Sequence, residues 1–527
     1  MSAEPTVPIT AKSTNAPQLE NGSSAARTLR LLGSVPVTIA IVAFFALQAS
    51  WVAVTASFGL YDEQYHLTAI KDFSTRWTPF FIHQSTADGA VGDVTRYDSY
   101  LYHYLLSFPY RALEGLGLGA GVTLVALRLF SVLAVLGALV YAWRLFRELG
   151  AGPVTANVAL AVVAIMPLMV FLAGTLNYDN LLMLLATAFF YYGLKLYKAD
   201  RFDLGLWLRV LLVGGLASVT QYASMAIAPV VVVGLLVRQV PMLRHGPRPS
   251  VRDFFLEPQR GVAKARAALA LGALVACALV LERYGLNILR YRTPLPSCLA
   301  VHPADICSMY APAARNSQLA LAHPGVGLSV SGAAGYLIHQ WIPLMMRYLT
   351  LIGTLGSDGV IRTSLGPHVF GAVLTWVVPV VLALVALSII VLRRVRGAGL
   401  LLGATGLYTL VLFAQNYSDY ARLGQPVGIQ GRYVLVLLPV IVGLACLTLA
   451  QLISMFRAPA RPGAAVGAVV ALVFVMSQGG GITSYLWAGS PPWWRTDSGV
   501  RFAVTTRASQ MARVLVIPDT LVPDPRR

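Results

Sequence analysis

Apolar segments of roughly 20 residues recur along this chain, and they limit its fold more strictly than any other feature. A helix rises about 1.5 Å per residue, so about 20 apolar residues cross the roughly 30 Å hydrocarbon core of a bilayer. Of the 527 residues, 57% are hydrophobic and only 12% are charged. This balance excludes a soluble multidomain protein. The sequence therefore predicts an all-α integral membrane protein.

About eleven transmembrane helices are predicted, and two large outer loops with short helices connect them. The fifth and sixth spans are short, so they could instead form one broken or re-entrant pair. The predicted spans cover residues 34–56, 120–143, 154–174, 178–197, 205–221, 223–238, 266–283, 367–392, 398–414, 433–455 and 463–480.

The distribution of charge predicts the orientation of these spans. Short loops rich in Lys and Arg remain cytoplasmic, and a cytoplasmic N-terminus places most of the cationic clusters on one side. The acids of the alternate loops, such as Asp62, Asp179 and Asp419, then face the opposite side. The net charge of +18 is explained by orientation and by attraction to anionic lipid, so we predict membrane lipid and no nucleic acid as a partner.

Three regions follow from this topology. Residues 1–30 are polar and lack apolar periodicity, so they are predicted to form a disordered cytoplasmic tail. Residues 31–480 form the transmembrane domain, with outer loops at 58–119 and 284–366. Residues 481–527 form an extracytoplasmic tail. Long loops in a compact membrane protein often carry function or cap a cavity, so we expect the site there.

The second outer loop contains Cys298 and Cys307, nine positions apart on the oxidising side. A disulfide is favoured over a metal site, because closing this loop would stabilise the fold by roughly 2.5 kcal/mol.

Residues 335–355 are apolar but interrupted by polar side chains. We predict an interfacial helix over the outer face; the alternative is a further span, which would reverse the topology after it.

Four polar clusters are predicted to meet at the outer surface. In a helix that enters the first outer loop, Asp62 and His66 would share a face, with Glu63 beside them. A solvated helix start with ordinary first-turn acids is the simpler alternative for this cluster. The other clusters are Arg96 to Asp98 with Tyr102 and His103, Asn177 to Asn180, and Gln430 to Tyr433.

Two arginines need an anionic partner. Arg128 lies about two turns into the second span, where an unpaired cation costs roughly 2.5 to 3.5 kcal/mol. Its partner is either structural, Asp98 or Asp179, or a lipid phosphate. Arg432 follows Gly431, which lets a ligand approach the backbone, and a guanidinium pairs in a fork with phosphate oxygens. The alternative for Arg432 is a cation that only sets topology.

These motifs together resemble the GT-C class of multi-span glycosyltransferases, and most closely a group of bacterial membrane proteins classed as a domain of unknown function. The resemblance covers most of residues 35–455. It is poorer through residues 284–366, and Gln221 stands where a basic residue is usual. The matching residues are Asp62-Glu63-x-x-His66, Ala126-Leu127-Arg128-Leu129, Met166-Pro167, Asn177-x-Asp179, and Gly428-Ile429-Gln430-Gly431-Arg432-Tyr433 running on to Leu438-Pro439.

The resemblance implies an enzyme of the bacterial plasma membrane. It would transfer a sugar from a polyprenyl-phosphate donor to a cell-envelope glycan, lipid or protein hydroxyl at the extracytoplasmic face. On this basis Asp62 is the predicted base, and Glu63 is its helper or a cation ligand. Arg432, Arg128 and Arg96 are predicted to bind the donor phosphate. The predicted supporting residues are His66, Asp98, Tyr102, Asn177, Asp179, Gln430 and Tyr433.

No cofactor is certain from these residues. A divalent cation, Mg²⁺ or Mn²⁺, is open, with His66 and Asp98 helping to complete its site, whereas the spacing does not indicate a tightly held zinc. Two other readings are a non-catalytic flippase or accessory subunit for lipid-linked glycans, and a surface-polysaccharide polymerase or ligase. Transporters typically show internal repeats and broken helices near mid-membrane. This sequence shows no convincing repeat, and its polar residues are predicted at one surface and not midway.

Overall fold

A computed structural model describes residues 29–59, 62–80, 89, 91–96, 99–245, 260–323, 325–350, 354–355, 361–362, 368–455, 466–471 and 473. Within these residues the fold is helical, apart from the short antiparallel strands β1 (Thr354–Leu355) and β2 (Ile361–Arg362). The predicted C-terminal tail and nearly all of the N-terminal tail lie outside the described residues. The predicted all-α class is thus confirmed for the membrane domain.

Among the described residues, six helices are long and apolar enough to cross a membrane, and a bent pair gives a seventh if it forms one span. The bent pair is α6 (Pro153–Ala164) with α7 (Pro167–Ala173). The six candidate spans lie at Val35–Thr55 in α2, Ala120–Leu149 in α5, Ser224–Leu243 in α10 (Ser224–His245), Ala263–Tyr291 in α12 (Arg260–Val280) and its continuation, Ala398–Leu423 in α20, and Gly431–Met455 in η5 (Gly431–Leu437) with α21 (Leu438–Met455).

Three further helices coincide with predicted spans. They are α8 (Asp179–Lys198), α9 (Leu204–Thr220) and α19 (His368–Val391). Most of the eleventh predicted span, residues 463–480, lies outside the described residues. The total of eleven therefore stays a prediction.

The broken span is α6–α7, whereas the sequence left a broken or re-entrant pair open only at residues 205–238. The two helices meet at an angle of 64° around Met166 and Pro167. Proline has no N–H for the preceding turn and its ring clashes there, so the helix stops and restarts. By contrast α9 and α10 are two separate helices joined at residues 221–223.

The core of the bundle is formed by aliphatic and phenyl side chains from the central helices. Phe45 of α2, Leu139 and Phe146 of α5, and Phe171 of α7 are among its fully buried members. Gly174 follows α7, where a Cβ atom would come within 2.6 Å of Val52. Glycine thus allows α7 to lie directly against α2, which fixes the position of the following loop to α8.

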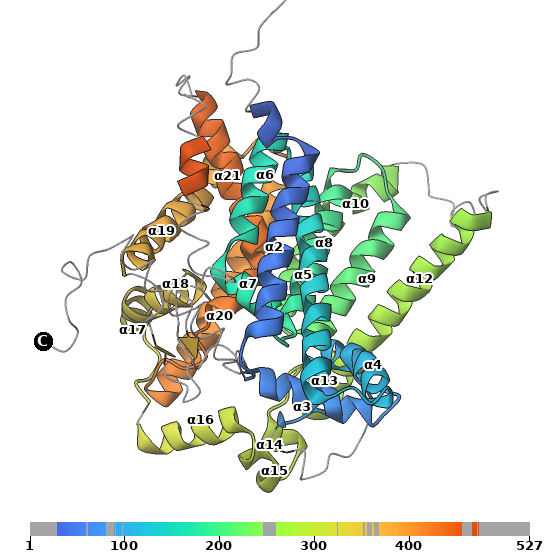
Figure 1. Cartoon of the computed structure of the whole chain (residues 1–527), viewed down its shortest axis with the longest axis vertical. Coiled ribbons are helices and arrows are strands. Elements are labelled where there is room, and N and C mark those ends of the chain that lie inside the picture. The colour runs from blue at the N-terminus through green and yellow to red at the C-terminus, as the bar shows by residue number, and fades with distance from the viewer. Residues whose placement is uncertain are drawn as a thin grey trace, which may run out of the picture.

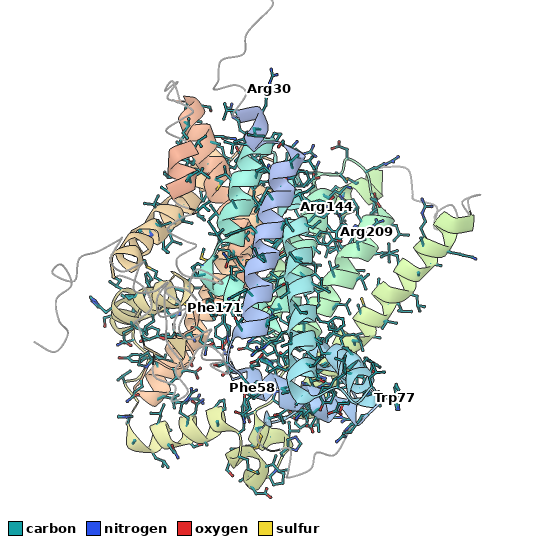
Figure 2. All side chains as sticks on the ribbon, in the orientation of Figure 1. Arg30, Phe58, Trp77, Arg144, Phe171 and Arg209 are labelled. Atoms are coloured by element: carbon teal, nitrogen blue, oxygen red, sulfur yellow. A yellow bond between two sulfur atoms is a disulfide. The ribbon has the colours of Figure 1, made fainter. Side chains whose placement is uncertain are left out.

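The first outer loop and the first part of the second outer loop lie at one end of the bundle, the lower end in Figure 1. The first loop contains α3 (Glu63–Ser74) and α4 (Leu101–Gly115). Arg30 and Arg144 lie toward the opposite end, whereas Phe58 and Trp77 lie at the loop end (Figure 2). The orientation of these two ends relative to the membrane stays a prediction. The first part of the second loop contains η3 (Leu281–Gly285), α13 (Leu286–Tyr291), α14 (Cys298–Val301), α15 (Ala304–Ser308) and α16 (Ala311–Ala322).

The segment predicted as an interfacial helix is helical. It forms α17 (Val330–Tyr336), the π-turn η4 (Leu337–Trp341) and α18 (Ile342–Thr350). The indole Nε1 of Trp341 donates a hydrogen bond of 3.0 Å to Asn416 Oδ1, which ties this segment to α20. Its placement relative to the membrane stays a prediction.

Candidate active site

Asp62 stands at the point where the chain turns from α2 into α3. Its φ of 63° lies in the left-handed region, which aspartate tolerates better than most residues. Asp62 is therefore not in the helix, and α3 begins at Glu63. The expectation that Asp62 and His66 share a helical face is wrong for this reason: Glu63 and His66 lie on the buried face of α3, while the side chain of Asp62 is 51% exposed.

Arg432 brings three distant parts of the chain together. Its Nη2 donates a hydrogen bond of 2.6 Å to Asp62 Oδ2, and its Nε lies 3.8 Å from Asp179 Oδ2. Arg432 opens η5 and Asp179 opens α8. The predicted meeting of the first outer loop with the entrance of the tenth span is thus confirmed, and Asp179 joins the same group.

Glu63 and Arg128 form a separate, fully buried ion pair. Arg128 Nε and Nη2 donate to the two carboxylate oxygens of Glu63 at 2.7 and 2.6 Å, and both side chains are 0% exposed. The other N–H groups of Arg128 donate to the carbonyls of Ala53, Ala56 and Ser57. These contacts use all five N–H groups that a guanidinium has.

This pair locks the end of α2 to α3 and α5. Glu63 also accepts the backbone N–H of Leu176 at 3.0 Å and that of Gly59 at 3.2 Å. The partner of Arg128 is therefore neither Asp98 nor Asp179, and Arg128 has no N–H left for a phosphate. The geometry does not fit the predicted phosphate contact of Arg128 or the predicted catalytic help from Glu63; both residues hold the loop that presents Asp62.

Arg96 is likewise engaged by protein groups. Its Nη1 pairs with Glu282 Oε1 at 2.7 Å, and its Nε donates to Asn287 Oδ1 at 2.7 Å. Its Nη2 donates to the carbonyls of Glu282 and Arg283. Arg96 thus joins the first outer loop to the second. A direct role in phosphate binding, as predicted, does not fit this geometry, which leaves Arg432 as the arginine of the predicted three that pairs with Asp62.

His66 and His103 form a buried pair beside the site. The Nδ1 of His103 donates to the Ser99 carbonyl at 3.2 Å, so its Nε2 accepts a hydrogen bond of 2.8 Å from His66 Nδ1. Both rings are neutral in this arrangement. Burial lowers the pKa of His103 from 6.5 to about 3, and burial, with His103 and Arg432 nearby, holds the pKa of His66 well below its usual value.

The histidine pair predicts a loss of stability at mildly acidic pH. Each histidine has a lower pKa in the folded protein than in the unfolded chain, so its contribution to stability is full above about pH 6.5 and decreases as the pH falls below that value. We expect the thermal unfolding temperature in detergent to fall between pH 7 and pH 5. His103→Gln should flatten this pH dependence, whereas the exposed control His339→Gln should not. An unchanged profile in His103→Gln would contradict the assignment.

The remaining predicted residues support the loop before α8. Tyr102 hydroxyl contacts Ser131 Oγ at 2.7 Å and accepts the backbone N–H of Asn177 at 3.1 Å. Asn177 Oδ1 in turn accepts the backbone N–H of Asp179 at 2.9 Å. The carbonyl of Gln430 accepts the N–H of Tyr433, whose ring lies 5.6 Å from the guanidinium carbon of Arg432. Asp98 lies outside the described residues.

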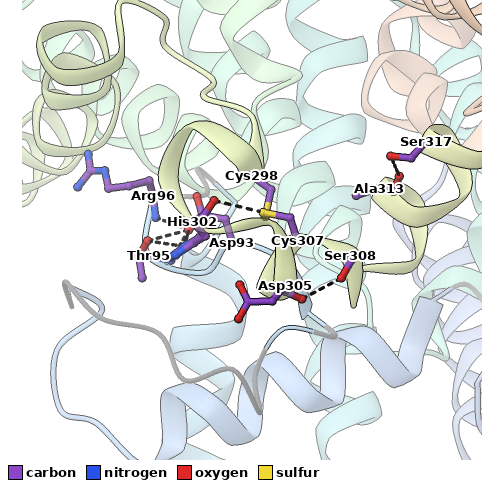
Figure 3. Close-up of a disulfide and its surroundings, with 10 residues drawn as sticks. All are labelled: Asp93, Thr95, Arg96, Cys298, His302, Asp305, Cys307, Ser308, Ala313 and Ser317. Carbon is purple, nitrogen blue, oxygen red and sulfur yellow. Dashed lines mark hydrogen bonds and ion pairs between the residues drawn. A yellow bond between two sulfur atoms is a disulfide. The ribbon is translucent and has the colours of Figure 1, made fainter. Parts of the chain in front are cut away.

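The second outer loop is fixed beside the site by a disulfide. Cys298 and Cys307 are bonded, with Cα atoms 5.7 Å apart, as predicted. Inside this closed segment, His302 Nε2 contacts Asp93 Oδ1 at 2.9 Å and Thr95 Oγ1 at 3.2 Å (Figure 3). The disulfide-closed segment is thereby held against the first outer loop.

Tyr310 is a neighbour of the site that the sequence did not reveal. It follows the disulfide-closed segment, and its ring lies 6.3 Å from that of Tyr65. Burial and the nearby Asp62 carboxylate raise the pKa of Tyr310 to about 12. Gly92, with φ of 70°, permits this approach, because a Cβ atom there would come within 3.0 Å of the Tyr310 ring. No local pattern around Tyr310 could have signalled this contact.

The described residues contain no group of three or more His, Cys, Asp or Glu side chains that could hold a metal ion. Asp62 and Asp179 offer carboxylate oxygens, which are suitable ligands for Mg²⁺ or Mn²⁺. However, the guanidinium of Arg432 lies between them. The predicted divalent cation stays a prediction.

Residues 115–246 match the profile of a family described as dolichyl-phosphate-mannose-protein mannosyltransferase. The matched segment contains α5 to α10, with Arg128 and Asp179, but neither Asp62 nor Arg432. It agrees with the predicted resemblance to membrane glycosyltransferases. No curated protein matches the sequence.

Two solved structures are similar over most of the chain. They are ArnT from Cupriavidus metallidurans bound to undecaprenyl phosphate, with 14% identity and a TM-score of 0.29, and the same protein in the apo state, with 16% identity and a TM-score of 0.28. The alignments cover 79% and 76% of this chain and 77% and 78% of the other. Scores this low place no residue of the site.

Proposed function

We propose that this protein is a GT-C type glycosyltransferase that transfers a sugar from a polyprenyl-phosphate donor to a cell-envelope hydroxyl at the extracytoplasmic face. The observation that carries the proposal is the contact between Asp62 and Arg432. It sets a half-exposed carboxylate, at the start of the first outer loop, against a buried guanidinium. The family matched by residues 115–246 supports the donor class, because its description names a polyprenyl-phosphate sugar.

The proposed reaction needs these two groups in different roles. Asp62 removes the proton of the acceptor hydroxyl while that oxygen attacks the anomeric carbon of the sugar. The bond between the anomeric carbon and the phosphate oxygen breaks, and the polyprenyl phosphate leaves with the bonding electrons. Arg432 stabilises the negative charge that develops on the leaving phosphate. Glu63, Arg128 and Arg96 keep the loops that carry the site in place.

The direct test is incubation of the purified protein with a panel of labelled polyprenyl-phosphate sugars and a cell-envelope extract, with and without EDTA. The proposal requires label to leave the lipid and appear in an acceptor fraction. The EDTA arm reports whether a divalent cation is needed. If label crosses the membrane of a proteoliposome but never leaves its lipid, the protein is a flippase and the proposal is wrong.

Replacing Arg432 with Ala should impair use of the donor more than use of the acceptor. The variant loses a charge-assisted contact with the phosphate, so we expect the apparent KM for the donor to rise about tenfold or more. Steady-state kinetics with each substrate varied in turn would measure this. Arg422→Ala is the matched control, because Arg422 is exposed and pairs with Asp419 at the end of α20. An unchanged donor KM in Arg432→Ala would assign Arg432 a structural role.

A further inference from the structure

Arg432 lies between two carboxylates that differ in environment. The first, Asp62, is 51% exposed and accepts a hydrogen bond of 2.6 Å from Nη2. The second, Asp179, is 4% exposed, and its Oδ2 lies 3.8 Å from Nε. Arg432 itself is 6% exposed, so its guanidinium is enclosed by the protein on the Asp179 side while the Asp62 side borders solvent.

The contact with Asp62 conflicts with the proposed role of Asp62 as base. An ion pair favours the charged form of a carboxylate, so a carboxylate paired with a guanidinium takes up a proton less readily than an unpaired one. Release from Arg432 would therefore let Asp62 take a proton from the acceptor more readily. A donor phosphate is a suitable competitor, since it offers anionic oxygens to the same N–H groups.

Asp179 offers Arg432 a second anchor. Its Oδ2 is buried and accepts no hydrogen bond within the described part of the chain. The backbone N–H of Asp179 is held by Asn177 Oδ1, which fixes the start of α8. Shortening the 3.8 Å separation by about 1 Å would give an ordinary charge-assisted hydrogen bond.

We propose that, when the donor binds, the Arg432 guanidinium exchanges Asp62 for the donor phosphate as its anionic partner. Asp179 is the positioning residue that holds the guanidinium in place during this exchange. The inference rests on the proposed function and extends it by giving the site an order of events. Asp62 becomes a more effective base once a phosphate occupies Arg432. The donor therefore binds before the acceptor hydroxyl is activated.

The test is the binding of undecaprenyl phosphate to detergent-solubilised protein, compared among single variants. Asp62→Asn removes the competitor, so the lipid should bind about tenfold more tightly. Asp179→Asn removes the anchor, so the lipid should bind about tenfold more weakly. Simple repulsion between carboxylates and phosphate predicts tighter binding for both variants, so tighter or unchanged binding in Asp179→Asn would overturn the proposal.

Controls separate this proposal from misfolding and from failure of the proposed function. Asp179→Glu restores the charge and should recover lipid binding, and Asp419→Asn, at an exposed ion pair in α20, should leave it unchanged. In a protein that carries Arg432→Ala, the Asp62 and Asp179 substitutions should not change lipid binding. Transfer of sugar by the wild-type protein, together with binding changes of the wrong sign, would refute the exchange alone. Absence of both lipid binding and transfer would refute the proposed function.

Discussion

Asp62→Asn is expected to abolish sugar transfer while the protein remains folded and inserted in the membrane. Asparagine keeps the shape of the side chain and tolerates the left-handed backbone at this position, where φ is 63°. It cannot accept the proton of the acceptor hydroxyl. Loss of a general base typically costs about 10²- to 10⁴-fold in rate, so kcat should fall by about that factor.

The measurement is the rate of transfer from a labelled donor, with size-exclusion profile and thermal unfolding as checks on folding. Asp305→Asn is the matched control, because Asp305 is an exposed acid in α15 of the second outer loop. It should keep the wild-type rate. Transfer at near the wild-type rate by the Asp62 variant would show that Asp62 is not the base, and another group would then have to take the proton.

The sequence predicted the position of Asp62 and Arg432 better than it predicted their neighbours. The charge distribution places both residues on the same side of the membrane, and the structure brings them within 2.6 Å. The sequence could not distinguish the roles of Asp62 and Glu63, because their roles depend on the residue at which α3 begins. Since the helix starts at Glu63, one acid faces Arg432 and the next faces the bundle.

Partners that are remote in sequence were predicted least well. The apolar span around Arg128 shows that this cation needs an anion, yet nothing local identifies Glu63, 65 residues away, as that anion. The same holds for Tyr310, which follows the disulfide-closed segment that His302 holds to Asp93 and Thr95. Such contacts depend on the packing of long loops, which follows from no short-range periodicity.

Arg128→Leu should fail in the opposite way from Asp62→Asn, through loss of folded protein. Removing one partner of a buried ion pair leaves the other charge unpaired, which costs about 3 to 5 kcal/mol. The carbonyls of Ala53, Ala56 and Ser57 also lose their donors. This loss is comparable with the total stability of many domains, so we expect little folded protein after extraction and a strongly lowered unfolding temperature.

Arg144→Leu is the control in the same helix, because Arg144 is exposed near the opposite end of α5. It should behave like wild type. The double variant Glu63→Leu with Arg128→Leu should be more stable than Arg128→Leu alone, since it leaves no buried charge unpaired. A stable Arg128→Leu protein that no longer binds undecaprenyl phosphate would instead show that Arg128 binds the donor. Neighbouring acids thus give separable outcomes: loss of Asp62 stops turnover, and disruption of the Glu63–Arg128 pair removes the fold that presents it.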